Sequence, residues 1–308
     1  MQKKFLELLQ CPLTGQALID DKGTLITSDG NHRYLQDEGE IPLFSEQFCS
    51  SDARIQQQHY DRIATKYLEN LSYPHTIEYT SYLDHAFLRE LPNKDLGISA
   101  EICCGHGEAF QLVREQVSLG IGIDISVSML RGINKILTRD KFLFAQGDAT
   151  MLPLRSGVFD SVLMFGGIHH VPDRQKLFNE VFRILKPGGT FIWREPVSDF
   201  FIWKWLRLLI YRISPTLDHK TERPLTWRET VPPLQSAGFT LLNWKTYGFF
   251  GFCLFMNSDV LIFNQFFRFI PGIKKLVRLS VQFDDRLLRL RPLRYSGLQV
   301  IGVAQKPV

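Results

Sequence analysis

Residues 96–116, LGISAEICCGHGEAFQLVREQ, contain the stretch that decides the fold. The first half is a short apolar run typical of a β-strand, and the second half has apolar residues at helical spacing. Between them, Gly105 and Gly107 let the backbone turn sharply and let a ligand approach it closely. The stretch therefore predicts a strand, a glycine-rich turn and a helix whose N-terminus presents free N–H groups to a ligand.

The two cysteines in this turn do not indicate a metal site. Neighbouring residues of a strand point to opposite faces, so Cys103 and Cys104 are poorly placed to share a metal. No second Cys/His pair lies nearby at zinc spacing. The chain has five cysteines and no apparent secretion signal, which favours reduced thiols in a cytoplasmic protein. We expect both cysteines to pack as small hydrophobic residues.

A second strand supports nucleotide binding. The run LGIGIDIS (119–126) ends its apolar part at Asp124, nineteen residues after Gly105. An acidic residue at this distance can accept hydrogen bonds from ribose hydroxyls. Phe110 occupies the position where dinucleotide-binding turns have a third small residue, which argues against NAD or FAD.

Two further stretches follow at regular intervals: FAQGDATMLPLRSGVFDSVLMFGGIHHVPD (144–173) and LFNEVFRILKPGGTFIWREP (177–196). With the turn and the second strand, they resemble the class I S-adenosylmethionine-dependent methyltransferases. They are most similar to the small-molecule branch that includes the ubiquinone and menaquinone methyltransferases. The resemblance covers about residues 55–245 and the last strand. It implies S-adenosylmethionine as the cofactor, with Asp124 at the ribose and Asp148 at the adenine. The cofactor contacts it implies are Glu101, Cys103, Gly105, Gly107, Asp124, Ile125, Asp148, Ala149 and Phe165.

The element order predicts an α/β fold: a Rossmann-like, seven-stranded, mostly parallel sheet with helices on both faces. We expect Gly188 to cap the helix before strand five, and Pro232 and Pro233 to break a later helix. In the family that the chain resembles, helices at residues 52–70 lie across the cofactor. For the helix over 52–70 we favour the alternative that its apolar residues, including Tyr60, pack into the core. The predicted strands are 98–103, 119–124, 141–145, 158–164 and 189–195, and the predicted helices between them are 107–116, 127–137 and 173–185.

The first 48 residues form a separate small unit in this interpretation, and residues 52–308 form the methyltransferase domain. The unit resembles the zinc-ribbon module that precedes guanine-N1 rRNA methyltransferases. Cys11 and His32 match ligand positions, but Thr14 replaces a third ligand, and two ligands do not hold structural zinc. We expect a degenerate ribbon without metal; a plain β-extension is an equally good interpretation.

Two insertions, 198–224 and 250–294, are not needed by the family core. Both should leave the ligand-binding side of the sheet, and both are rich in aromatic residues. Residues 268–294 carry eight Lys/Arg against two Asp, while the whole chain has a net charge of +4. Residues 273–289 read as an amphipathic helix. The insertions predict a lid and a lipophilic acceptor, with contact to an anionic membrane at the inner face of the cell, or to an acidic carrier protein, as alternatives.

The chemistry of methyl transfer to oxygen or carbon calls for a base near the cofactor. His169 and His170 follow strand four, and Glu195 ends strand five. We expect these three to be the catalytic residues, with a purely structural role as the alternative for His170. Arg194 is an alternative partner for Glu195, and His219 is a weaker second base.

Two other functions remain as alternatives. An rRNA or tRNA base methyltransferase would resemble the family that has an Asn/Asp-Pro-Pro-aromatic run after strand four, which this chain lacks. Nucleic acid is therefore disfavoured as a partner. A non-catalytic, methyltransferase-like binding module would not need Gly105, Gly107, Asp124 and Asp148, all of which are present.

Overall fold

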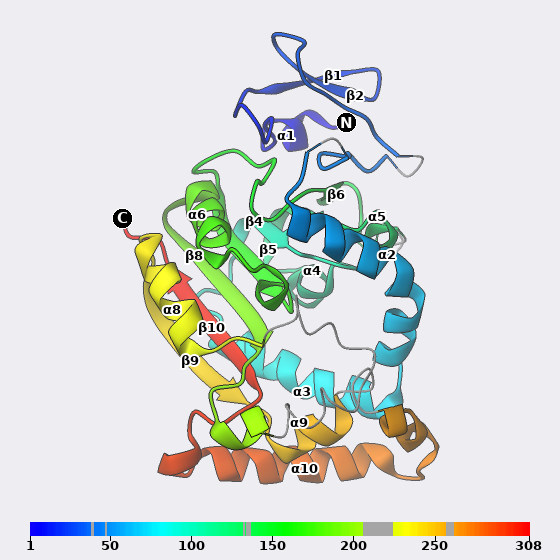
Figure 1. Ribbon diagram of the computed structural model, residues 1–308, viewed down its shortest axis with the longest axis vertical. Helices are drawn as coiled ribbons and strands as arrows, with labels where there is room; N and C mark the ends of the chain where they lie inside the picture. Colours follow the sequence, from blue (N-terminus) through cyan, green and yellow to red (C-terminus); the bar gives the residue numbers. More distant parts are fainter. Residues whose placement is uncertain (38–39, 47, 132, 134–136, 206–223, 257–261) are drawn as a thin grey trace.

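The computed structural model describes residues 1–37, 40–46, 48–131, 133, 137–205, 224–256 and 262–308. At its centre is a seven-stranded sheet with the order β6-β5-β4-β7-β8-β10-β9 (Figure 1). Neighbouring strands are parallel except that β10 runs antiparallel to both β8 and β9. The predicted fold class is confirmed. The strands are β4 (Gly97–Ile102), β5 (Val117–Asp124), β6 (Phe142–Gln146), β7 (Phe159–Phe165), β8 (Leu185–Pro196), β9 (Thr240–Tyr247) and β10 (Gln299–Gln305).

The sheet is buried on both faces because successive side chains along its strands point alternately into two hydrophobic cores, one on each face. In β7, Val162 and Met164 belong to one core, whereas Leu163 belongs to the other. Side chains of α6 and α8 complete the first core, and those of α3 and α4 complete the second. These helices are α3 (Pro74–Glu90), α4 (Glu108–Val113), α6 (Arg174–Ile184) and α8 (Trp227–Ser236); the short α5 (Val127–Leu130) follows β5.

The N-terminal residues form a small sheet of their own that shares the first core. The sheet has the order β1-β2-β3, with β1 (Leu18–Asp21), β2 (Thr24–Thr27) and β3 (Arg33–Tyr34), and α1 (Lys3–Leu6) precedes it. The backbone at residues 42–44 pairs with Gln146 and so extends the large sheet beyond β6. Cys11 is buried with its Sγ 3.1 Å from the Tyr34 hydroxyl oxygen. The resemblance to a zinc ribbon and the boundary at residue 48 stay predictions.

Helix α2 (Ser51–Leu71) matches the predicted helix 52–70, and the Ser50 hydroxyl caps it by accepting from the Ala53 N–H. The expected core packing is wrong for two of its residues: Ile55 is exposed and Tyr60 is half-buried. The side chains of Ile63 and Tyr67 lie outside the described set. The reason is position: α2 crosses the open carboxyl end of the sheet instead of covering a sheet face (Figure 1).

Two expectations from glycine and proline are wrong. Gly188 has a φ of +79°, but α6 already ends at Ile184, and Gly188 lies in an irregular part of β8 where the pairing with β7 shifts. Helix α8 runs through Pro232 and Pro233. The turn before them is exposed, so water can satisfy the carbonyl groups that lose a partner, and the burial of Val231 and Leu234 holds the helix on the sheet.

The insertions gather at the end of the molecule opposite the N-terminal sheet (Figure 1). Residues 201–205 are helical, and His219, the weaker second base, lies outside the described residues. None of the helices in the described ranges combines the length and apolar character that crossing a membrane requires. The second insertion forms α9 (Phe250–Phe255), η3 (Ile262–Phe269), α10 (Ile273–Leu288) and η4 (Arg291–Leu293), where η marks a 3-10 helix.

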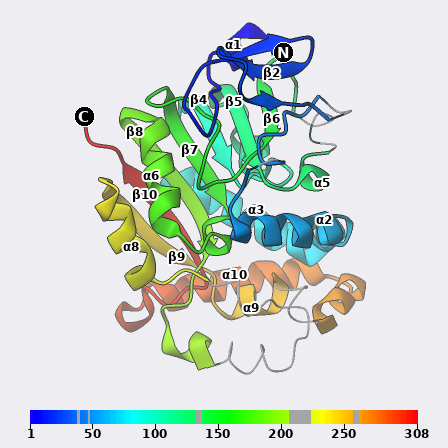
Figure 2. The ribbon, with the colours of Figure 1, turned by 45° about the horizontal axis from the view of Figure 1, so that its top comes forward.

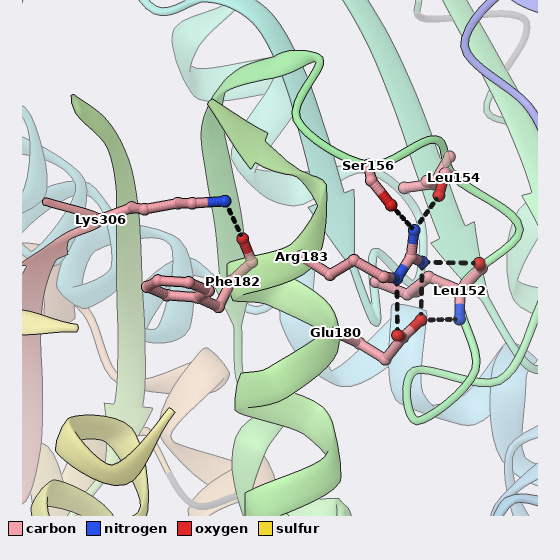
Figure 3. A network of polar contacts seen from close by, with 7 residues as sticks. All are labelled: Leu152, Leu154, Ser156, Glu180, Phe182, Arg183 and Lys306. Atoms are coloured by element: carbon pink, nitrogen blue, oxygen red, sulfur yellow. Dashed lines mark hydrogen bonds and ion pairs between the residues drawn. The ribbon is translucent and has the colours of Figure 1, made fainter. Parts of the chain in front are cut away.

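A polar network fixes the loop between β6 and β7 to α6 (Figure 3). The Arg183 guanidinium donates to the backbone oxygens of Leu152 and Leu154 and pairs with Glu180. Glu180 in turn accepts from the Leu152 N–H at 2.7 Å. This loop begins at Asp148, a predicted cofactor contact, so the network also supports the site.

Replacing Arg183 with alanine should lower the free energy of unfolding by about 2–3 kcal/mol, because two half-buried carbonyl groups lose a charged donor. Urea unfolding of both proteins measures the difference. The control is Lys3→Ala, which removes an exposed pair with Glu7 and should change stability by less than about 0.5 kcal/mol. Equal effects of the two substitutions would contradict the role of the network.

Candidate active site

A cleft of about 270 Å³ opens at the carboxyl ends of the central parallel strands, with the N-terminal part of α2 as one wall. Eight of the nine predicted cofactor contacts line it: Glu101, Cys103, Gly105, Asp124, Ile125, Asp148, Ala149 and Phe165. The ninth, Gly107, does not. It precedes α4 with a φ of +78°, and a Cβ on it would lie 3.2 Å from Leu137.

The turn after β4 is held by a buried carboxylate. Glu101 accepts the N–H groups of Ala109 and Phe110, each at 2.9 Å, and so fixes the first turn of α4 to the end of the strand. Burial opposes the charged form and raises the pKa of Glu101 to about 8, although both hydrogen bonds favour the carboxylate. Cys103 takes a left-handed φ of +52°, which is uncommon for a residue other than glycine.

Asp124 ends β5 as predicted and joins it to the turn. Its carboxylate accepts from the Gly105 N–H at 2.8 Å and the Ser126 N–H at 2.9 Å. Burial raises the pKa of Asp124 to about 6. A carboxylate has about four acceptor positions, so two remain for hydroxyl groups of a ligand.

Asp148, just after β6, likewise accepts hydrogen bonds from the loop that follows its strand. It accepts from the Thr150 N–H at 2.8 Å, from the Ser50 N–H at 2.8 Å and from the Thr150 hydroxyl at 2.7 Å, which leaves about one of its four acceptor positions. The second bond fixes the start of α2 beside the cleft. The cleft wall from α2 agrees with the alternative that the family resemblance implies, a helix across the cofactor, and not with the favoured core packing. Ala53, Gln56 and Tyr60, which line the cleft, stand at helical spacing.

The lining of the cleft is strongly acidic. It holds one lysine, Lys176, and six carboxyl groups, of which Glu101, with its raised pKa, is mostly neutral at pH 7. The six are Asp52, Glu101, Glu108, Asp124, Asp148 and Asp173. This charge favours a cationic ligand and opposes phosphate groups. S-adenosylmethionine carries a sulfonium and an ammonium group, so the residues present fit this cofactor.

His170 lies in the cleft wall beside α2. Its Nε2 atom is 2.7 Å from the hydroxyl oxygen of Tyr60, which also lines the cleft. Its buried Nδ1 atom has no hydrogen-bond partner among the described residues. Burial, with smaller contributions from His169 and His59, lowers the pKa of His170 well below its usual range. The ring is therefore neutral at pH 7.

Glu195 and His169 lie behind this loop and do not line the cleft. Glu195 is completely buried, and its Oε1 atom accepts from the N–H groups of Gly167 and Ile168. Its Oε2 atom lies 2.8 Å from His169 Nδ1. Burial raises the pKa of Glu195 and lowers that of His169. The arrangement holds the backbone that carries His170.

The alternative pairing of Glu195 with Arg194 is not observed. Arg194 instead pairs with Asp84, at 2.6 Å, and with Glu108. Its guanidinium also lies 4.1 Å from the centre of the Phe165 ring. The arginine thus fixes Phe165 in the cleft wall.

Residues 100–193 match the family model described as methyltransferase domain. This part of the chain is a methyltransferase domain. The match runs from within β4 to within β8. It includes the cleft-lining acids at or just beyond the ends of β4, β5 and β6, which are Glu101, Asp124 and Asp148. For this methyltransferase domain, the prediction of S-adenosylmethionine as the cofactor is confirmed, whereas the role of each contact residue stays a prediction.

Two curated relatives share the name demethylmenaquinone methyltransferase. The chain is 26% identical over 172 residues to the demethylmenaquinone methyltransferase of Lactiplantibacillus plantarum, covering 48% of this chain and 73% of that protein. It is 33% identical over 124 residues to the Staphylococcus aureus (strain MRSA252) protein of the same name, covering 37% of this chain. The match spans about half (52%) of the length of that S. aureus relative.

Among solved structures, the [4+2]-cyclase SpnF has a TM-score of 0.59 and 17% identity, covering 84% of this chain and 98% of that chain. Identity this low shows the fold alone. A cyclase with the fold of this methyltransferase domain also shows that the fold does not decide the reaction.

Proposed function

We propose that the protein transfers a methyl group from S-adenosylmethionine to an oxygen or carbon atom of a lipophilic small molecule. The observation that carries this proposal is the acidic cleft with the Tyr60–His170 pair in its wall. The acidic lining suits the cofactor, and the pair supplies a proton acceptor in the same cleft. The names of the curated relatives support a lipophilic, quinone-like acceptor.

The cofactor supplies an electrophilic methyl group, so the protein must position the acceptor and remove its proton. We assign the proton to a relay. The acceptor hydroxyl donates to the Tyr60 oxygen while the Tyr60 hydroxyl donates its own proton to His170 Nε2. Glu195 and His169 act as positioning residues, since they organise the loop without lining the cleft.

Binding of the cofactor is assigned to the carboxylates at the strand ends. Asp124 has free acceptor positions for the ribose hydroxyls, and Asp148 has one for the adenine amino group. Neither is occupied by a lysine or arginine within the described residues, so both keep their capacity for hydrogen-bond donors on the ligand.

The acidic cleft argues against the alternative of an RNA base methyltransferase, because phosphate groups near the mouth would be repelled. It also argues against a non-catalytic module, because an unused cleft has no need for desolvated carboxylates, whose burial costs stability.

The proposal is tested by incubating the purified protein with methyl-labelled S-adenosylmethionine and either of two acceptors. One is demethylmenaquinone dispersed in detergent and reduced with dithionite to its quinol form, whose hydroxyl groups can donate a proton, and the other is unmodified ribosomal RNA. We expect label in the organic phase, attached to the quinone, and none in the RNA. Label in the RNA would overturn the proposal. Absence of label from the demethylmenaquinone, together with no binding of S-adenosylmethionine in calorimetry, would overturn it as well.

A further inference from the structure

The end of the molecule opposite the N-terminal sheet exposes many large apolar side chains. Residues 201–205, α9, η3 and α10 form this end, as both views show (Figures 1 and 2). Trp205 is 73% exposed and Phe269 is 69% exposed, values more typical of lysine than of an aromatic residue. The exposed apolar residues of this end, here called the apolar surface, are Phe201, Ile202, Trp205, Phe250, Leu254, Phe266, Phe269, Ile270, Leu276, Leu279, Phe283 and Leu290.

Helix α10 shows that this exposure is built into a rigid element. Its inner side is fixed by Asp284, which is buried and accepts from the Tyr79 hydroxyl and from the N–H groups of Phe249 and Gly251. Arg278 anchors the helix further by pairing with Glu78 on α3. The helix therefore cannot rotate to bury its other apolar side.

The amphipathic pattern predicted one apolar face on this helix, and in the structure part of that face is buried and part is exposed. Ile273 and Val277 are buried against the protein, whereas Leu276 and Phe283 are about half exposed. Leu276, Leu279 and Phe283 stand three and four residues apart and so form one stripe along the helix, and the exposed Leu290 follows just beyond its end. Packing against the protein therefore uses Ile273 and Val277 and leaves the stripe exposed.

Cations border this stripe. Lys275, Arg286 and Arg289 lie on the adjoining side of α10 and are exposed. At the C-terminal end of the helix, an open groove of about 1260 Å³ continues the basic surface towards β9. Its lining includes Arg89, Arg289, Arg291 and Arg294, and none of these four has an ion-pair partner among the residues that the structure describes.

Aromatic residues with a polar end also line the groove. Trp227 is 44% exposed and Tyr295 is 58% exposed, and the Arg294 guanidinium lies over the Tyr295 ring. Tryptophan and tyrosine are enriched where an apolar phase meets water. The same end of the molecule therefore combines apolar side chains, interfacial aromatic residues and arginines without carboxylate partners in the described part of the chain.

We propose that this surface binds an anionic phospholipid bilayer, with α10 lying in the plane of the interface. The apolar stripe would enter the boundary between headgroups and acyl chains, and the arginine groove would take lipid phosphate groups. Charge complementarity selects this occupant. The groove has five cations, four of them arginines without an ion-pair partner among the described residues, against the two carboxyl groups of Asp199 and Asp285. A nucleic acid would match the charge but would leave the leucine and phenylalanine side chains in water.

The placement also connects the surface to the site. Residues 201–205 follow β8, and α9 follows β9, so both leave the sheet at the end where the cleft opens. A bilayer at this surface would present a lipophilic acceptor on the cleft side of the protein. The binding proposal itself does not depend on the proposed reaction.

The test is co-sedimentation of the full chain with vesicles of phosphatidylcholine, with or without an equal part of phosphatidylglycerol. We expect at least tenfold tighter binding to the anionic vesicles and a severalfold loss between 50 and 500 mM salt. Phe283→Ser should weaken binding by roughly tenfold, and Leu279→Glu with Phe283→Glu should abolish it. Arg289→Glu with Arg291→Glu should remove the preference for phosphatidylglycerol, since each cation contributes roughly fivefold.

The matched control makes the same change on exposed apolar residues of the N-terminal sheet, Ile19→Glu with Leu35→Glu, and should bind like the wild type. Calorimetry with S-adenosylmethionine shows for each variant that the fold is kept. No binding of the wild type to anionic vesicles would overturn the proposal. Equal losses in the control and in the α10 variants would overturn it too.

Discussion

Replacing Asp124 with alanine should weaken S-adenosylmethionine binding by roughly 100-fold or more. The carboxylate has two acceptor positions left after its bonds to Gly105 and Ser126. Two hydrogen bonds from ribose hydroxyls to a charged acceptor are worth about 1.5–3 kcal/mol each, which corresponds to roughly 10²–10⁴ in the dissociation constant. Isothermal calorimetry of wild type and variant measures this constant.

The control is Asp160→Ala, which removes a carboxylate from the opposite end of the sheet. Asp160 also accepts a backbone N–H, that of Ile98 at 2.9 Å, and it pairs with Lys186. Its loss should reduce stability and leave cofactor affinity within about twofold. If both variants lose affinity equally, the effect belongs to the fold and Asp124 is not a cofactor ligand.

The second large effect is expected from His170→Ala. If Nε2 receives the proton through Tyr60, methyl transfer to demethylmenaquinone should slow by roughly 10²–10⁴-fold, the usual contribution of a general base. Tyr60→Phe should lose a similar factor, because it breaks the relay at its first step. Cofactor affinity should remain within a few fold in both variants. The control, His85→Ala, removes an exposed histidine whose ring bonds the Ser81 carbonyl oxygen, away from the cleft.

The pH profile distinguishes this role from a structural one. Burial lowers the pKa of His170, so the neutral ring that accepts a proton is present at pH 7 and is lost only as the pH falls through the lowered value. With S-adenosylmethionine at saturation, so that protonation of Asp124 near pH 6 does not limit cofactor binding, the wild-type kcat should therefore be flat from pH 6.5 to 8 and decline in more acidic solution. A rate that rises steeply across pH 6.5–8, or a His170→Ala variant with wild-type kcat, would rule out the relay.

The adjacent positions of His169 and His170 in the sequence do not reveal that the two side chains have different partners. His169 turns back to the buried Glu195, while His170 meets Tyr60 from a helix 110 residues earlier in the chain. Glu195 was expected to act in the cleft because it ends a parallel strand. Its carboxyl group instead accepts hydrogen bonds from the backbone N–H groups of the loop after β7.

The sequence by itself determined the alternation of strands and helices along the chain and the acids at the strand ends, although the helix predicted over 127–137 ends at Leu130. These features are local: an apolar run, a glycine turn and the residue that follows the strand lie within a few positions of one another. For the same reason the sequence alone places Asp124 and Asp148 at the ligand-binding edge. Backbone continuity carries the side chain to the carboxyl edge of a parallel sheet.

Only the tertiary structure decided which surfaces meet. The cleft wall from α2, the Tyr60–His170 pair and the exposed half of α10 depend on contacts between segments far apart in the chain. An amphipathic pattern states how wide an apolar face is, but not how much of it a neighbouring element will cover. On α10 the contacts of Asp284 and Arg278 fix which side of the helix faces the protein. The apolar stripe on its other side stays exposed because no described element packs against it.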